Sequence, residues 1–184
     1  MSARVFVAAA IGASLMACAQ PPRSENSAAS SADGDPSTRF IGVIGARSQH
    51  APPFLGVSET NFYCLRSFVD RQTGETRHQV YVSDSYTGAE RHWDAARDGA
   101  GRPLRVLEIS RVKIGCDGDC SYAEEFAANI PESELRTDPR GLKVTFSAAS
   151  GAEKTILVSE NQIDAQLAAV NAQRGKAPAV SSYK

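Results

Sequence analysis

Two cysteines separated by three residues, Cys116-Asp-Gly-Asp-Cys120, form the motif with the clearest chemical potential in this sequence. Asp-Gly is a strong turn dipeptide and β-rich segments flank it, so we expect the motif at the tip of a β-hairpin. Residues opposite each other in a hairpin have Cβ atoms about 4.5–5.5 Å apart, close to the spacing in a disulfide. We therefore predict a Cys116–Cys120 disulfide that fixes the hairpin register.

Other roles for this pair need partners or contexts that differ from those in the sequence. A metal site would need a second Cys or His pair at ligand spacing. A redox-active pair is typically CxxC at the start of a helix, whereas this motif is CxxxC on a hairpin. Two free thiols, or a bond from Cys64 to either cysteine, stay open as alternatives.

Matches to other catalytic motifs lack the expected context. Ser110-Arg-Val-Lys113 fits the acylating SxxK motif, but it lies in a predicted strand rather than at a helix start, and no KTG accompanies it. His50, His78 and His92 form neither HxH nor HExxH. We therefore predict no catalytic residue, no metal site and no cofactor.

An aromatic pair and an acidic loop form a candidate binding surface. His92-Trp93 follows a glycine-containing turn, where it either contacts a ligand or partner or belongs to the core. Asp117 and Asp119 do not fit the calcium-binding DxDxDG pattern, so turn formation is their simpler role. Glu124 and Glu125 point to opposite faces of a predicted strand, and we expect both at the solvated surface.

Length and charge restrict the class of protein. The chain has 184 residues, with 20 Lys and Arg against 21 Asp and Glu. Nucleic-acid binding needs a basic excess, so we predict no nucleic-acid partner. Beyond the first 18 residues, no apolar run is long enough for a transmembrane helix.

The N-terminal residues follow the pattern of an export signal. Arg4 supplies the positive charge, and Val5–Ala17 forms an apolar segment of 13 residues. That length is too short to cross a bilayer but typical of a signal peptide. The segment ends in Leu15-Met16-Ala17-Cys18, which resembles the lipobox of bacterial lipoproteins. This resemblance implies cleavage after Ala17, lipidation of Cys18 and attachment to a membrane through acyl chains.

The same resemblance implies a location. Ala19, rather than Asp, follows the cysteine, which in the enterobacterial sorting pattern implies the periplasmic side of the outer membrane, with the inner membrane as the alternative. Disulfides persist in that oxidising compartment. Lipidation of Cys18 leaves three cysteines, of which Cys64 is expected to be unpaired and buried. Beyond the lipobox, the chain is similar to small uncharacterised lipoproteins of Gram-negative bacteria, a likeness that implies no activity.

Composition divides the chain into a signal peptide (1–17), a lipidated N-terminus and flexible tether (18–39), a globular domain (40–174) and a disordered tail (175–184). The tether carries no large apolar side chain, and its r.m.s. span is roughly 25 Å. β-strand patterns dominate the globular part. The strand at 104–114 changes apolar phase, so we expect a β-bulge near Ser110–Arg111 that keeps both halves buried.

One helix is expected near the C-terminus. Ser159-Glu-Asn-Gln162 is a capping box, and Ile163, Leu167 and Val170 follow it as one apolar stripe. We therefore predict an α+β fold, in which a twisted antiparallel sheet of about five to seven strands has the C-terminal helix packed on one face.

These patterns favour a lipid-anchored, periplasm-facing, non-catalytic binding or envelope-assembly module with a protein partner in the envelope. The alternative is a small periplasmic enzyme or thiol-redox protein that uses Cys64, Cys116 and Cys120.

Overall fold

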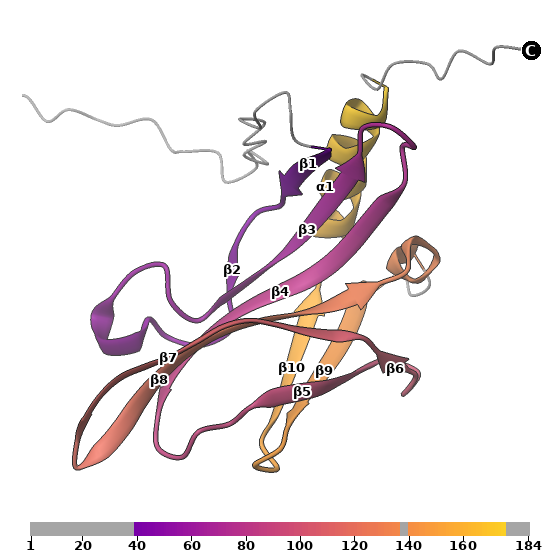
Figure 1. The fold of residues 1–184 in the computed structure, drawn as a ribbon. Coiled ribbons are helices and arrows are strands. Elements are labelled where there is room, and N and C mark those ends of the chain that lie inside the picture. Colours follow the sequence, from indigo (N-terminus) through magenta and orange to yellow (C-terminus); the bar gives the residue numbers. More distant parts are fainter. Residues whose placement is uncertain (1–38, 137–139, 176–184) are drawn as a thin grey trace, which may run out of the picture.

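The structure is a computed structural model that describes residues 39–136 and 140–175 (Figure 1). The predicted signal peptide (1–17) lies outside these residues, as do the tether up to residue 38 and the tail from residue 176. The strands are β1 (Phe40–Ile44), β2 (Ser48–Gln49), β3 (Phe62–Asp70), β4 (Thr76–Thr87), β5 (Trp93–Asp98), β6 (Pro103–Leu104), β7 (Val106–Asp117), β8 (Asp119–Ile130), β9 (Leu142–Ala148) and β10 (Glu153–Val158). The helices are the 3-10 turns η1 (Phe54–Gly56) and η2 (Glu132–Arg136), and the α-helix α1 (Glu160–Arg174).

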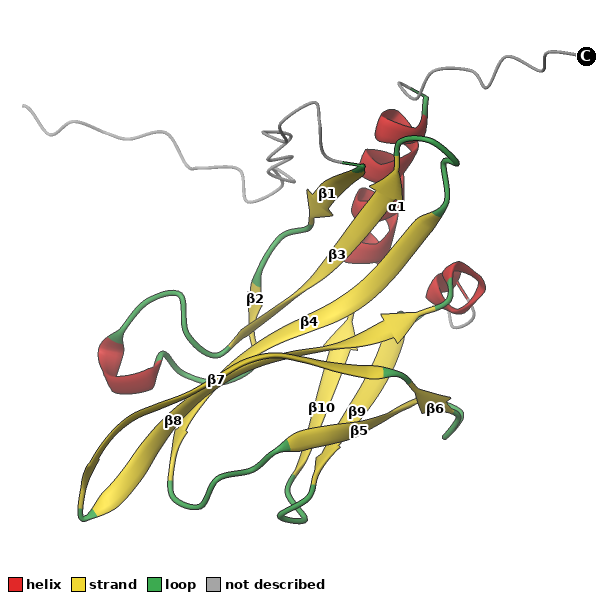
Figure 2. Cartoon of the chain, viewed as in Figure 1, coloured by secondary structure: helices red, strands yellow, loops and turns green. Residues whose placement is uncertain are grey.

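The strands form two antiparallel sheets, and the C-terminal helix α1 packs on the first of them (Figure 2). The predicted α+β class is therefore confirmed. The first sheet has six strands in the order β1-β3-β4-β8-β7, with β2 paired to β3. The second sheet has four strands in the order β10-β9-β5-β6. The sequence pattern did not separate these two sheets, because alternation shows that a strand has a buried face but not which layer covers it.

The main core lies between the two sheets and includes Phe126 of β8 and Phe146 of β9, whose rings meet edge to face. The helix α1 packs on β1 and β3, where Val170 contacts the buried valines Val43 and Val69. Ser159 and Gln162 form the predicted capping box, and the apolar stripe is buried, so the helix prediction is confirmed.

The predicted bulge is present, but its expected consequence is wrong. The register between β7 and β8 shifts after Glu108 and again after Lys113. The first shift lies next to the expected position. However, Ile109, Val112 and Ile114 are 40%, 55% and 52% exposed. They are exposed because β7 is an edge strand, and the β7–β8 hairpin runs beyond the second sheet to a free tip (Figure 1).

Candidate functional site

The hairpin tip carries the predicted disulfide. Cys116 and Cys120 lie opposite each other in register and are bonded through their sulfur atoms. Asp117 and Asp119 form the next pair, and Gly118 closes the turn with φ of 84°. That left-handed conformation favours glycine, and both aspartates are exposed beside it. The disulfide therefore fixes the end of an exposed two-stranded arm.

A set of exposed apolar side chains, which we call the hairpin patch, is spread along β7 of this arm. It consists of Ile109, Val112 and Ile114, all exposed. Within the described residues β7 pairs with β8 alone, so its other edge presents unpaired backbone groups. Exposed Lys113 and the two register shifts are features that limit uncontrolled strand pairing at such an edge. The patch is therefore suited to a partner of defined shape rather than to open-ended sheet growth.

For Trp93, the structure supports the core role, one of the two roles that the sequence left open. Trp93 is only 3% exposed and stacks on Phe126, with ring centroids 5.2 Å apart, so it belongs to the core. The His92 side chain is about half exposed, near Glu90. No hydrogen bond or ion pair between described residues joins the His92 side chain to Asp117 or Asp119. The two loops touch elsewhere, where the Gly88 amide donates to the Cys120 carbonyl at 2.9 Å.

Two buried carboxylates form the most polar part of the interior. Asp84 of β4 and Glu124 of β8 lie directly opposite each other and are 2% and 3% exposed. The expectation that Glu124 is solvated is therefore wrong. Strand alternation places Glu124 on the same face as buried Phe126, which packs against the second sheet, whereas Glu125 lies on the other face.

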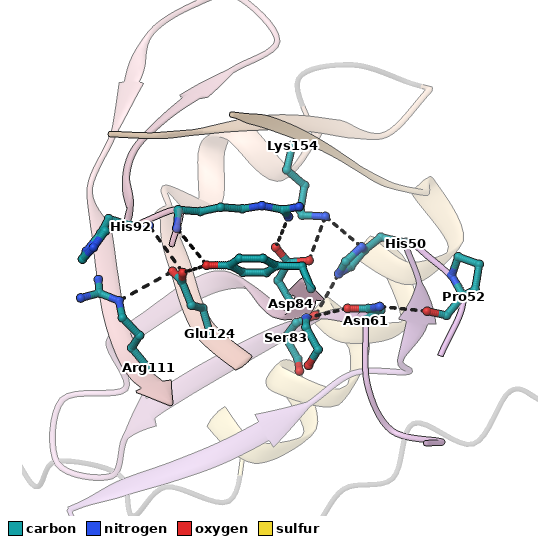
Figure 3. Close-up of polar contacts among 12 residues, drawn as sticks. His50, Pro52, Asn61, Ser83, Asp84, His92, Arg111, Glu124 and Lys154 are labelled. Carbon is teal, nitrogen blue, oxygen red and sulfur yellow. Dashed lines mark hydrogen bonds and ion pairs between the residues drawn. The ribbon is translucent and has the colours of Figure 1, made fainter. Parts of the chain in front are cut away.

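Asp84 joins the two sheets through ion pairs (Figure 3). Its carboxylate contacts Nζ of Lys154, on β10 of the second sheet, at 3.1 Å and Nη1 of Arg91 at 3.0 Å. The Lys154 ammonium also lies 3.2 Å from Nδ1 of His50, and Nε2 of that ring is 2.8 Å from the Ser83 carbonyl. Burial lowers the pKa of His50. The neutral ring can then accept from Lys154 and donate to Ser83.

Glu124 is enclosed by donors. The Tyr86 hydroxyl donates to it, and the His92 amide approaches at 3.4 Å. Burial and the adjacent Glu124 carboxylate raise the pKa of Tyr86. Arg111 Nε lies 3.9 Å from Glu124, and the Arg91 guanidinium stacks 3.9 Å from the Tyr86 ring centre. Both buried carboxylates are therefore held by cations or hydrogen bonds, and the Asp84–Lys154 pair joins the two sheets.

A second chain of polar contacts has the residue types of a hydrolase triad, but the two ring nitrogens of its histidine have exchanged partners. Ser67 Oγ lies 2.9 Å from His78 Nδ1, and His78 Nε2 lies 3.2 Å from Glu132. Ser67 is completely buried, and the Gln166 amide donates to its Oγ at 2.8 Å. The nucleophile of a hydrolase must be accessible to its substrate, and Ser67 is not. These contacts therefore hold α1 and η2 against the first sheet rather than performing acyl transfer.

Cys64 is separated from the disulfide. Its thiol is buried, and desolvation raises its pKa to about 11, which suppresses the reactive thiolate. Cys64 pairs with Tyr81, which pairs with Ala127, seven residues along β8 from Cys120. Seven residues of strand span about 23 Å. The structure therefore does not bring the three cysteines into one thiol centre.

The ion pair between the sheets was not predicted, although the sequence carries a signal for it. By strand alternation, Asp84 lies on the same face of its strand as Val80 and Val82, and Lys154 lies on the same face as Ile156 and Val158. A charged residue on the apolar face of each of two strands indicates a buried ion pair. The sequence pattern does not say which two strands meet.

Within residues 39–136 and 140–175, no cluster of three or more His, Cys, Asp or Glu side chains is arranged to hold a metal ion. The described helices include none that is long and apolar enough to cross a membrane. Comparisons with protein-family models, curated proteins and solved structures find no match.

Proposed function

We propose that this chain is a lipid-anchored, periplasm-facing module that binds an envelope protein through the hairpin patch and has no catalytic role. Leu15-Met16-Ala17-Cys18 supports the anchor, since Cys18 then becomes the lipidated N-terminus. Ala19 favours the outer membrane as the location. The tether would hold the folded domain within roughly 25 Å of the bilayer.

The observation that carries the binding role is the exposed apolar arm. Three large aliphatic side chains on one strand are costly to leave in water, at about 25 cal/mol per Å² of apolar surface. Their gathering on a free edge, next to a disulfide that stiffens the tip, is typical of a contact surface rather than scattered exposure. Leu157, an exposed apolar residue on the edge strand β10, differs because its carbonyl already accepts from the Tyr63 hydroxyl at 2.7 Å.

Site-specific photo-cross-linking in intact cells tests this role. A cross-linker at position 112 should give a discrete product with an envelope protein, and Ile114→Asp should abolish that product. The matched control places the cross-linker at position 157, an exposed apolar position on an edge strand of the second sheet. Equal products from positions 112 and 157, or none from 112, would contradict the proposal.

A further inference from the structure

An open groove of about 440 Å³ lies at one end of the first sheet, away from the hairpin patch. The beginning of β4, the end of β8 with the two residues after it, and β6 with the following Arg105 line it. Its apolar walls include Pro103, Leu104 and Pro131. Such walls suit an organic group rather than a bare ion.

Two arginines give this groove its charge. Arg77 and Arg105 both line it, and both are exposed. No ion pair or hydrogen bond is found for either guanidinium among the residues that the structure describes. By contrast, Arg39 and Arg174, at the same end of the sheet, are paired with Asp70 and Glu132.

The carboxylate that lines the groove is already neutralised. Glu132 accepts from Arg174 Nη2 at 2.5 Å and from His78 Nε2 at 3.2 Å. The Arg174 guanidinium and the His78 ring hold the pKa of Glu132 at about 2, well below its usual range. Among the residues that the structure describes, Arg77 and Arg105 therefore remain as two positive charges without a carboxylate partner, beside apolar walls.

We propose that this groove binds the phosphate group of an organic phosphate ester through Arg77 and Arg105. The guanidinium fork matches phosphate oxygens with paired hydrogen bonds, and the apolar walls would contact the carbon part of the ester. The ester is either a phospholipid head group or a soluble phosphate ester, since both present the same oxygens.

The position of the groove favours the lipid as the source, a choice that rests on the proposed anchor. The described chain begins at Arg39, which binds Asp70 at the end of β3. Arg77 pairs with Phe68, two residues from Asp70 on the same strand. The tether would therefore enter at the end of the sheet that carries the groove, and its roughly 25 Å span keeps this end near head groups.

The test uses the mature-length chain, residues 18–184, with Cys18→Ser, so that no acyl chain contributes. Its binding is measured to phosphatidylcholine vesicles with and without 30% phosphatidylglycerol, and to sn-glycerol 3-phosphate by calorimetry. We expect binding to the anionic vesicles, and we expect Arg77→Gln with Arg105→Gln to weaken it about 30-fold, as two arginines near an anionic surface would. Arg97→Gln with Arg136→Gln removes the same charge from exposed arginines that do not line the groove and are each paired with a carboxylate, and should change binding less than twofold.

The outcomes separate the two sources and the two proposals. Loss of vesicle binding in the groove variant alone supports a lipid head group. Groove-dependent binding of glycerol phosphate without vesicle binding supports a soluble ester at the same site. Binding of neither probe, or equal weakening by both double variants, would overturn the site. The chain used in this test carries no lipid anchor. The binding result would therefore stand even if the protein proved not to be lipidated in cells.

Discussion

Asp84→Asn is the most informative perturbation of the interior, because it preserves shape while removing one buried charge. Asp84 is 2% exposed, and its carboxylate holds Lys154 and Arg91 at 3.1 and 3.0 Å. The asparagine variant leaves two neighbouring cations without their anion. The contact between β4 and β10 then loses its ion pair.

The magnitude follows from burial. Removing one partner of a buried ion pair costs about 3–5 kcal/mol. Part of that cost is relieved, because the side chains of Lys154 and Arg91 retain 16% and 30% exposure. We therefore expect the free energy of unfolding to fall by about 3 kcal/mol. The melting temperature should fall by roughly 10 °C in a domain of this size.

Urea denaturation followed by circular dichroism measures this loss, and Asp164→Asn is the matched control. Asp164 also pairs with an arginine, Arg136 at 2.9 Å, but the pair is exposed and should be worth less than about 1 kcal/mol. A double-mutant cycle with Lys154→Met isolates the coupling between Asp84 and Lys154. If Asp84→Asn costs no more than Asp164→Asn, the reasoning that this pair joins the two sheets is refuted.

Three further results are expected. Cys64, with its pKa raised to about 11, should react with iodoacetamide at pH 7.5 only after unfolding; rapid labelling of the native protein would show an accessible thiolate. Replacing Cys116 and Cys120 with serine should lower the free energy of unfolding by about 2 kcal/mol without unfolding the domain, as measured by urea titration. Burial lowers the pKa of His78 in the folded protein, whereas the same side chain in the unfolded chain binds a proton near pH 6.5. Protonation therefore favours the unfolded chain, and the free energy of unfolding should decline as the pH falls below about 6.5. His78→Gln should flatten that decline between pH 7.5 and 5. An unchanged slope of unfolding free energy against pH would contradict this role of His78.

Much of the local structure was predictable, because local signals carry it. The capping box at Ser159 and Gln162 sets the start of α1, and the spacing of its apolar residues sets the buried face. The Asp-Gly turn between Cys116 and Cys120 sets a hairpin whose partners must face each other. These features depend on residues that are close in the sequence.

Long-range packing explains the errors. Glu124 is buried because the second sheet covers its face of β8, and its own strand does not encode that neighbour. Ile109 and Val112 look like core residues by type, but their strand extends past the covering layer. Trp93 is buried because it stacks on Phe126 of the other sheet, a contact between distant segments. The candidate surfaces therefore emerged from topology rather than from motif.

Mass spectrometry of the intact protein isolated from the membrane fraction of its own cells tests the proposed anchor most directly. The account predicts a chain that begins at Cys18, with a mass increase that matches a thioether-linked diacylglycerol and a third acyl chain where the new amino group is also acylated. A chain that retains Met1, is cleaved at another residue or carries an unmodified Cys18 would contradict it.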